Sequence, residues 1–267
     1  MKPDLYHHGM SVCGAKARMV LAEKEVQWNS HYVDIRAGEG RNPDYLRLNP
    51  NGVVPTLVNG NDVVIESTVI GEYVDEGFPG PPLKPDDPMD RARVRLWTKQ
   101  LDEGIHIPAT ATLSFAIALR EEFVKRFETH EALQAHIASK LNPKNREFLR
   151  QTTELGIEAP LVRESIELFD NLFGNMEIVL TRGPWLAGET FSLADIGYAP
   201  YMARMDCLQL SWLWGDRPHV AEWYERLKRR PTYKPSIVDW FDEREIALMQ
   251  KNGLKTKETL QQQVRRI

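Results

Sequence analysis

A carboxylate and two hydroxyls follow one another at Glu66, Ser67 and Thr68, where a run of β-branched residues gives way to helical periodicity. Hydroxyl side chains are favoured at helix starts because they accept hydrogen bonds from the first N–H groups. Those N–H groups have no partner inside the helix, and the helix dipole makes this end positive. We therefore expect the mouth of this helix to be a seat for a small carboxylate.

A second group of reactive side chains stands in the loop 10–14, which contains Ser11 and Cys13. Apolar residues then recur at helical spacing, at Ala17, Val20 and Leu21. Ser11 and Cys13 therefore lie near the start of a helix spanning 15–24. Serine in such a place is commonly a cap, and a small cysteine is commonly a buried filler. These structural roles stand beside any chemical one.

The elements around these groups predict a small α/β domain. The β-branched runs 53–58 and 63–65 flank the turn residues 59–62, which is the pattern of a β-hairpin. The following helix is expected to carry Val69, Ile70, Tyr73 and Val74 on one face. Upstream, the pattern predicts a strand from Leu5, a strand over 26–35 and a short helix from 42 to 48. This β-α-β-α-β-β-α series favours a sheet of about four strands.

Helical periodicity dominates the chain beyond a proline-rich linker, placed at 80–89. Asp87 and Pro88 predict the start of a long helix that Pro108 kinks before about Phe127. Ser192 and Asp195 form a capping signature with reciprocal hydrogen bonds. Further helices are expected over 130–140, 143–154, 159–180, 192–210 and 217–229. The helical domain is assigned to 90–235, and 236–267 is a charged, glutamine-rich extension.

Composition bounds the function classes that the chain can serve. Its 267 residues are 42% hydrophobic and 27% charged, which is ordinary for a globular protein. The 34 basic and 38 acidic residues are interleaved, so no basic block indicates a nucleic-acid partner. Two cysteines cannot form a disulfide framework, and no apolar run predicts a signal core or a membrane span. We expect a cytoplasmic protein without a membrane partner.

Four motifs, in this order, resemble those of the soluble glutathione transferases. They are a thiol-activating loop at Ser11-Val12-Cys13-Gly14, a cis-proline dipeptide at Val54-Pro55, a γ-glutamyl-binding pair at Glu66-Ser67 and a capping box at Ser192 to Asp195. The resemblance covers about 230 residues and leaves out only the tail. It implies a thioredoxin-like, glutathione-binding domain over 1–79, followed by an all-helical substrate domain.

Two subgroups of the family share features with this chain. The loop 9–13 is similar to bacterial tetrachlorohydroquinone dehalogenases and to the zeta class. The stretches 66–73 and 87–99 are similar to bacterial β-aryl-etherases and nu-like relatives. Gly14 departs from the etherase pattern, which has a serine there. The subgroup and the substrate therefore stay open.

The resemblance implies glutathione as co-substrate and assigns residues to each part of it. Ser67 receives the γ-glutamyl carboxylate, while Glu66 and Asp102 of the partner subunit in a homodimer face the ammonium. Val54, before Pro55, pairs its backbone with the cysteinyl portion. Asn51 and Arg41 are candidates for the glycyl carboxylate, with surface loop polarity as the favoured alternative for each.

The resemblance leaves three functions open for the chain. In the first, Ser11 donates to the glutathione thiolate near a helix N-terminus, and the thiolate attacks an electrophilic, aromatic-bearing substrate, with β-aryl ether cleavage included. In the second, Cys13 forms a mixed disulfide with glutathione in a reductive dehalogenase or disulfide-type oxidoreductase. In the third, the chain is a non-enzymatic glutathione-binding or regulatory protein of the same fold.

The resemblance places the electrophile pocket between the two domains. Candidate walls are aromatic, with core packing as the alternative for each: Phe115, Tyr198, Tyr201 and Trp212 or Trp214. Cys207 is expected in the core. His7 and His8 point to opposite faces of a strand, and the other histidines lack ligand spacing, so we expect no metal site.

Overall fold

A computed structural model describes residues 2–140 and 142–264 of the chain. The chain divides into two compact units. The first contains Met1–Leu101, Val179–Ala203 and Ala221–Asp242, and the second contains Asp102–Ile178, Arg204–Val220 and Glu243–Ile267. An α/β segment followed by helices confirms the predicted fold class. Within the described residues, no helix is long and apolar enough to cross a membrane.

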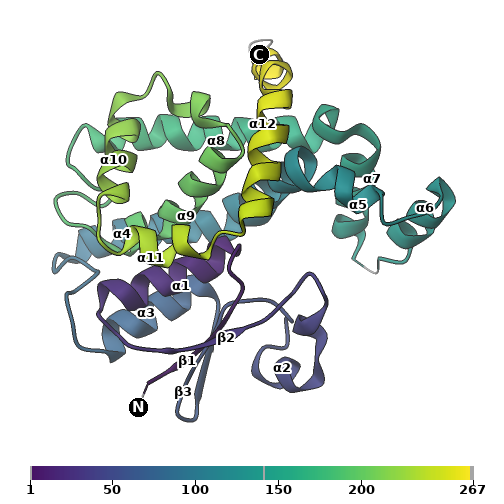
Figure 1. Ribbon diagram of the computed structural model, residues 1–267. Coiled ribbons are helices and arrows are strands. Elements are labelled where there is room, and N and C mark those ends of the chain that lie inside the picture. Colours follow the sequence, from purple (N-terminus) through teal and green to yellow (C-terminus); the bar gives the residue numbers. More distant parts are fainter. Residues whose placement is uncertain (1, 141, 265–267) are drawn as a thin grey trace. The chain divides into compact units, whose positions relative to one another are not determined.

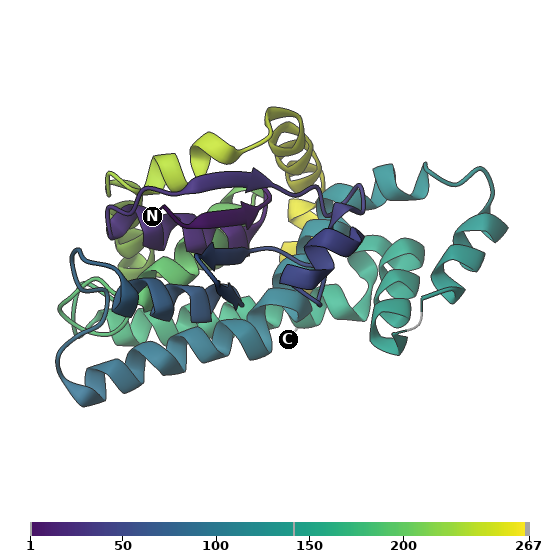
Figure 2. The same ribbon diagram turned by 90° about the horizontal axis from the view of Figure 1, so that it is seen from below.

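The first unit is built on a four-stranded sheet with the order β2-β1-β3-β4. Its strands are β1 (Asp4–His7), β2 (Asn29–Tyr32), β3 (Thr56–Asn59) and β4 (Asp62–Ile65). β1 and β2 are parallel, and Figure 2 shows their arrows running in the same direction. β3 is antiparallel to both β1 and β4. The predicted hairpin is therefore confirmed, whereas the strand expected over 26–35 is only four residues long.

Helices α1 (Val12–Glu23) and α3 (Ser67–Gly77) lie side by side over one face of the sheet (Figure 1). Buried apolar residues of α1 and α3, among them Leu21, Ile70 and Val74, are removed from solvent. Val69 was expected on the same face, but its side chain is 52% exposed. Helix α2 (Pro43–Leu48) begins after Asn42, whose side chain accepts from the Asp44 N–H.

Buried Lys24 and half-buried Lys84 connect the proline-rich linker to α3. Lys24 donates to the Asp75 carboxylate at 3.2 Å and to the Gly80 carbonyl at 3.4 Å. Lys84 donates to Glu72 at 2.5 Å. Asp87 then caps α4 (Pro88–Gln100), as predicted. The remaining helices of this unit, wholly or in part, are α9 (Leu193–Cys207), α10 (Pro218–Lys228) and α11 (Tyr233–Ser236).

The second unit is helical, and part of it has a wider helical geometry. Two stretches, Leu101–Ala111 and Ser114–Leu119, are π-helical. The single kinked α-helix expected up to about Phe127 was therefore wrong, because the hydrogen-bond pattern widens around Pro108 instead. Gly253 packs against the Leu208 carbonyl so closely that a Cβ would clash. The α-helices are α5 (Arg120–Val124), α6 (His130–Ala138), α7 (Pro143–Leu155), α8 (Pro160–Leu180) and α12 (Glu243–Val264).

Candidate functional site

The mouth of α3 is shaped by an unusual backbone at Glu66. This residue is the N-cap, with φ 67° and ψ 118°, and its side chain makes no capping hydrogen bond with the described residues. A non-glycine residue held in such a region costs about 1–3 kcal/mol, and such residues cluster at ligand clamps. Glu66 is exposed and Ser67 is buried at the first helical position. The exposed carboxylate and the first turn of the helix are therefore presented together.

The Val54–Pro55 peptide bond is cis, as the resemblance implies. The loop before it is held by two side chains that the sequence analysis did not single out. Buried Asn49 donates to the Val53 carbonyl at 2.8 Å and to the Thr56 hydroxyl at 3.0 Å. The Tyr45 hydroxyl donates to the same Val53 carbonyl at 2.6 Å. These bonds fix the backbone that leads into Val54, and the Asn-Pro-Asn-Gly turn signature was the available clue.

Ser11 is the N-cap of α1, and its hydroxyl oxygen accepts from the Gly14 N–H at 3.0 Å. A hydroxyl carries one proton and two acceptor lone pairs. Capping uses a lone pair and leaves the proton available for donation elsewhere. The structural role and the predicted catalytic role of Ser11 are therefore compatible in one geometry.

The two cysteines differ in their surroundings. Cys13 is half-buried at the second position of α1, close to the positive end of that helix. Cys207 is half-buried in the last turn of α9, and burial raises the pKa of its thiol to about 11. Since the thiolate is the nucleophile, this raised pKa disfavours reaction of Cys207 at neutral pH.

A buried polar cluster supports the loop that carries Ser11, and the sequence analysis did not anticipate it. His7 is fully buried and Arg18 is 1% exposed. Arg18 lies 3.1 Å from the His7 Nδ1 atom, and Ser30 Oγ lies 2.8 Å from Nε2. Arginine can only donate, so Nδ1 accepts and the proton sits on Nε2. Burial, followed by the charge of Arg18, lowers the pKa of His7 to about 3, so this histidine is neutral.

Besides Ser67 and Glu66, three residues were predicted to bind the ends of glutathione, and all three lie at the surface. Arg41 is exposed at the end of a short 3-10 helix, Glu39–Arg41. Asn51 is exposed, and its backbone N–H donates to the Asn49 side chain at 3.1 Å. Asp102 is exposed at the start of the π-helical stretch in the second unit. Their assignment to ligand groups stays a prediction.

The proposed aromatic walls pack mainly within their own units. Tyr198 is buried in the first unit and donates to the Trp97 carbonyl at 3.0 Å. Tyr201 is also buried there, with the Lys16 ammonium 5.6 Å from its ring centroid. The others lie in the second unit: Phe115 packs against Phe123 and Phe148, Trp214 packs against Phe173, and Trp212 is half-buried in the 3-10 helix Ser211–Trp214.

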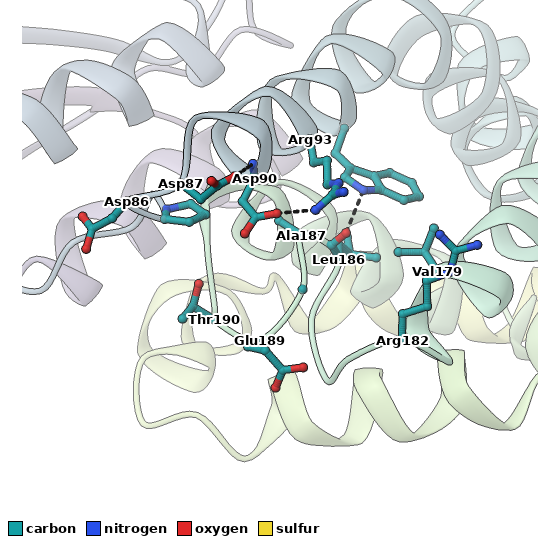
Figure 3. Close-up of a pocket in the computed structure, with 13 residues that line it drawn as sticks. Asp86, Asp87, Asp90, Arg93, Val179, Arg182, Leu186, Ala187, Glu189 and Thr190 are labelled. Atoms are coloured by element: carbon teal, nitrogen blue, oxygen red, sulfur yellow. Dashed lines mark hydrogen bonds and ion pairs between the residues drawn. The ribbon is translucent and has the colours of Figure 1, made fainter.

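A pocket of about 560 Å³ in the first unit contains none of the predicted site residues (Figure 3). It lies between the start of α4 and the loop 185–190. Its lining mixes acids and arginines, and an Arg93–Asp90 ion pair crosses one wall. The Trp97 indole donates to the Leu186 carbonyl at 2.9 Å, and both residues line the pocket. Among the described residues, no group of three or more metal-ligating side chains is gathered.

Comparison with known proteins gives matches to both halves of one family. Residues 10–76 match the family described as Glutathione S-transferase, N-terminal domain, and residues 158–226 match Glutathione S-transferase, C-terminal domain. The crystal structure of β-etherase LigF from Sphingobium sp. strain SYK-6 is similar, with a TM-score of 0.74 and 27% identity. The similarity covers 88% of this chain and 98% of that one.

Three curated relatives carry different names. Glutathione S-transferase TCHQD from Arabidopsis thaliana is 29% identical over 90% of this chain and 91% of its own length. The tetrachloro-p-hydroquinone reductive dehalogenase of Sphingobium chlorophenolicum is 27% identical over 88% and 95%, respectively. FtsZ-localized protein A of Caulobacter vibrioides is 26% identical over 88% and 90%.

Proposed function

The chain belongs to the glutathione S-transferase superfamily, and from this premise we propose that it is a glutathione transferase acting on an electrophilic, aromatic-bearing substrate. The observation that carries the proposal is the mouth of α3. Glu66 is held at φ 67° without capping the helix through its side chain, and a ligand carboxylate suits the first-turn N–H groups that follow.

In this proposal each part of glutathione meets a chemically complementary group. The γ-glutamyl carboxylate lies at Ser67 and the first turn of α3, and its ammonium faces Glu66. The backbone of Val54 pairs with the cysteinyl portion. Asn51 and Arg41 remain the candidates for the glycyl carboxylate.

Ser11 stabilises the thiolate of the bound tripeptide. A free thiol has a pKa of about 8.5 and is mostly protonated at neutral pH. The Ser11 hydroxyl donates to the sulfur while its oxygen continues to accept from Gly14, and the positive end of α1 adds to the stabilisation. The thiolate then forms a C–S bond, and the leaving group departs with its electron pair. In an aryl ether the leaving group is an aryl oxide, which takes up the proton released by the thiol.

The first experiment separates binding from chemistry. Isothermal titration with glutathione and with S-methylglutathione is expected to give measurable binding of both. Conjugation of 1-chloro-2,4-dinitrobenzene is expected to fall about 100-fold in Ser11→Ala, as for the loss of a donor to a developing or stabilised anion. Ser11→Thr keeps the hydroxyl and serves as the matched control. Full activity in Ser11→Ala would remove Ser11 from the mechanism.

A second candidate reaction uses Cys13, because this thiol lies at the start of α1 and a named relative is a reductive dehalogenase. A glutathione thiolate displaces halide from the substrate, giving a thioether. The Cys13 thiolate then attacks the glutathionyl sulfur, the ring carbon takes the electron pair and a proton, and a mixed disulfide forms. A second glutathione releases Cys13 as glutathione disulfide departs.

Mass spectrometry distinguishes this route. A mass increase of one glutathionyl group on the peptide carrying Cys13 after exposure to glutathione disulfide supports it. Retention of all turnover in Cys13→Ser excludes it and leaves the Ser11 reaction. The Cys207→Ser variant is the control, since the pKa of Cys207 is raised to about 11 and its thiol is not expected to react.

A non-enzymatic role is the third candidate, because one relative is named for its localisation to FtsZ. Such a role uses the same fold but requires no glutathione thiolate. If glutathione produces neither binding heat nor a shift in melting temperature at millimolar concentration, both enzyme reactions lose their co-substrate. The chain would then be a protein-binding member of the superfamily.

We further propose that the protein acts as a homodimer. Met89 and Leu96 lie seven residues apart on one face of α4, and their side chains are 61% and 67% exposed. Large apolar side chains exposed together commonly mark an interaction surface. Leu96→Glu is expected to yield monomers in size-exclusion chromatography with light scattering. It would also remove Asp102 of the partner subunit from the glutathione ammonium.

A further inference from the structure

The segment Ser236–Asp242, which begins with the last residue of α11, packs against the loop that leads into α1. The Ser236 carbonyl accepts from Arg18 Nε at 2.8 Å, and the Asp242 N–H lies 3.2 Å from the Met10 sulfur. A Cβ on Gly9 would lie 2.7 Å from the Trp240 carbonyl oxygen, so this approach requires glycine. Residues 218 to 232 positions apart in sequence therefore share one packed interface within the first unit.

Arg18 is the centre of that interface. Its guanidinium donates to the His8 carbonyl at 3.3 Å and the Gly9 carbonyl at 3.1 Å, in addition to Ser236. The Trp240 ring centroid lies 4.8 Å from its central carbon, and the His7 and Trp240 rings meet edge to face at 4.6 Å. A planar guanidinium with this many fixed partners has little freedom, and replacement by lysine cannot reproduce the fork.

The same interface reaches Ser11 through one shared acceptor. The His8 carbonyl that accepts from Arg18 also accepts from the Ser11 N–H at 3.1 Å. Only Gly9 and Met10 separate these two residues, and both contact the segment 236–242 or its guanidinium partner. The position of the Ser11 hydroxyl is thus set partly by a segment that lies outside the family motifs.

We propose that the segment 236–242 is a positioning element of the thiol site: through Arg18 and Trp240 it fixes the loop that presents Ser11 to the glutathione sulfur. The inference rests on the proposed transferase function. Arg18 and Trp240 act through the loop and are positioning residues, since neither is assigned a contact with substrate. Loss of the Trp240 ring loosens the loop and misplaces the donor, while the γ-glutamyl seat at α3 is left intact.

The test compares Trp240→Ala with Trp185→Ala. Trp185 is the matched control because it is also half-buried beside arginines of the same unit, with Arg226 5.5 Å from its ring centroid. The apparent pKa of the bound glutathione thiol is read from thiolate ultraviolet absorbance. In Trp240→Ala it is expected to rise by about one unit. The value of kcat is expected to fall about tenfold, with glutathione Kd within about twofold, because misplacement rather than binding is affected.

A second readout needs no glutathione. Alkylation of Cys13 by iodoacetamide, mapped by peptide mass spectrometry, is expected to be about tenfold faster in Trp240→Ala, because a loosened loop exposes the start of α1 more often. Cys207, whose thiol pKa is raised to about 11 by burial, is the negative control and is expected to stay unmodified in both proteins. Trp240→Phe is expected to restore both readouts towards wild type.

The outcomes separate this inference from the proposed function. Absence of glutathione binding by the wild type removes the transferase function, and the Cys13 alkylation rate then decides the loop-positioning role alone. A folded Trp240→Ala protein with unchanged Cys13 reactivity and unchanged thiol pKa overturns the inference. Equal changes in Trp185→Ala also overturn it, since they would reflect general destabilisation. If Trp240→Ala does not fold, Arg18→Lys is measured in its place, with the same expected directions.

Discussion

The helix starts at α9 and α3 use similar residues in opposite ways. In the first turn of α9, the Asp195 carboxylate is fully buried and accepts from the Ser192 N–H, the Ser192 hydroxyl, the Leu186 N–H and the Trp223 indole, all within 3.1 Å. Before α3, Glu66 is exposed and makes no side-chain cap with the described residues. The α9 start is closed, meaning that buried side chains of the protein itself satisfy it, whereas the α3 start is open to solvent.

We infer from this difference that the start of α9 serves folding stability, whereas the start of α3 serves ligand binding. The cap at α9 satisfies its own donors, so a change there is felt as stability. The backbone at Glu66 carries a conformational cost that no capping contact repays, so a change there is felt as affinity. Stability and glutathione affinity measured on the same variants test whether the two helix starts differ in this way.

The largest stability effect is expected for Asp195→Asn. The amide NH₂ must face a neighbouring N–H donor in either orientation, and this costs about 3 kcal/mol of unfolding free energy in a buried site. Urea unfolding followed by circular dichroism measures it. Asp87→Asn is the matched control, because Asp87 is an exposed cap and asparagine caps equally well, so we expect a change within about 0.5 kcal/mol. Equal losses in both variants would contradict the assignment of Asp195 as a closed, buried cap.

The start of α1 offers a test by pH, through buried His7. Its pKa is lowered from 6.5 to about 3, so the neutral form is favoured on folding. This stabilisation is present above pH 6.5 and is lost as pH falls towards 3, because the unfolded chain takes up the proton first. The stability difference between wild type and His7→Asn is therefore expected to shrink by about 2 kcal/mol from pH 7 to pH 5.

The stability of wild type must be compared with that of His7→Asn, because Asp195 makes stability depend on pH in the opposite direction. Burial raises the pKa of its carboxyl to about 6, so its charged form is disfavoured and acidification between 6 and 3.8 favours folding. Both proteins retain Asp195, and its contribution cancels. A difference that does not change with pH would mean that His7 is protonated in the folded protein.

Ser67→Ala is expected to lower glutathione affinity about tenfold, equivalent to about 1.4 kcal/mol, through loss of the hydroxyl at the proposed carboxylate seat. Stability is expected to change little, because Ser67 is the first helical residue and Glu66 is the N-cap. Calorimetric titration and thermal unfolding of the same preparation give both numbers. A large loss of stability with unchanged affinity would make α3 a closed start like α9.

The smallest effect on stability is expected for Glu66→Gly, and it differs from the others in being a gain. Glycine adopts positive φ without a Cβ penalty, so this variant is expected to be about 0.5–1 kcal/mol more stable while binding glutathione more weakly. Glu66→Gln is its control, since it removes the charge and keeps the backbone cost. If Glu66→Gly is less stable than wild type, the backbone at this position is not strained.

Much of the fold was predictable because local patterns and tertiary packing agree. The turn 59–62 between β-branched runs predicts the hairpin of β3 and β4, and Asp87-Pro88 predicts the start of α4. Where packing overrides periodicity, prediction fails. Val69 lies at helical spacing with Tyr73 but is exposed, and the stretch from Leu101 is π-helical, which no 3.6-residue pattern can indicate.

The candidate site was predictable only where a motif marks it. The cis bond before Pro55 and the cap at Ser11 follow from their motifs. The support behind them does not. Arg18 falls in a helix pattern where arginine normally indicates solvent, and its partner Trp240 lies in an extension without motif. Long-range polar packing of this kind leaves no trace in local sequence.

The sheet has a further consequence for how this protein behaves at high concentration. Its outer strands, β2 and β4, are each four residues long, so each free edge extends only about 13 Å. Exposed edges can recruit strands from other molecules, and short edges are one way in which proteins prevent this. Although β4 exposes Val63, it begins with charged Asp62 directly after a tight turn. We expect edge-to-edge aggregation to be disfavoured by strand length itself, independently of any ligand.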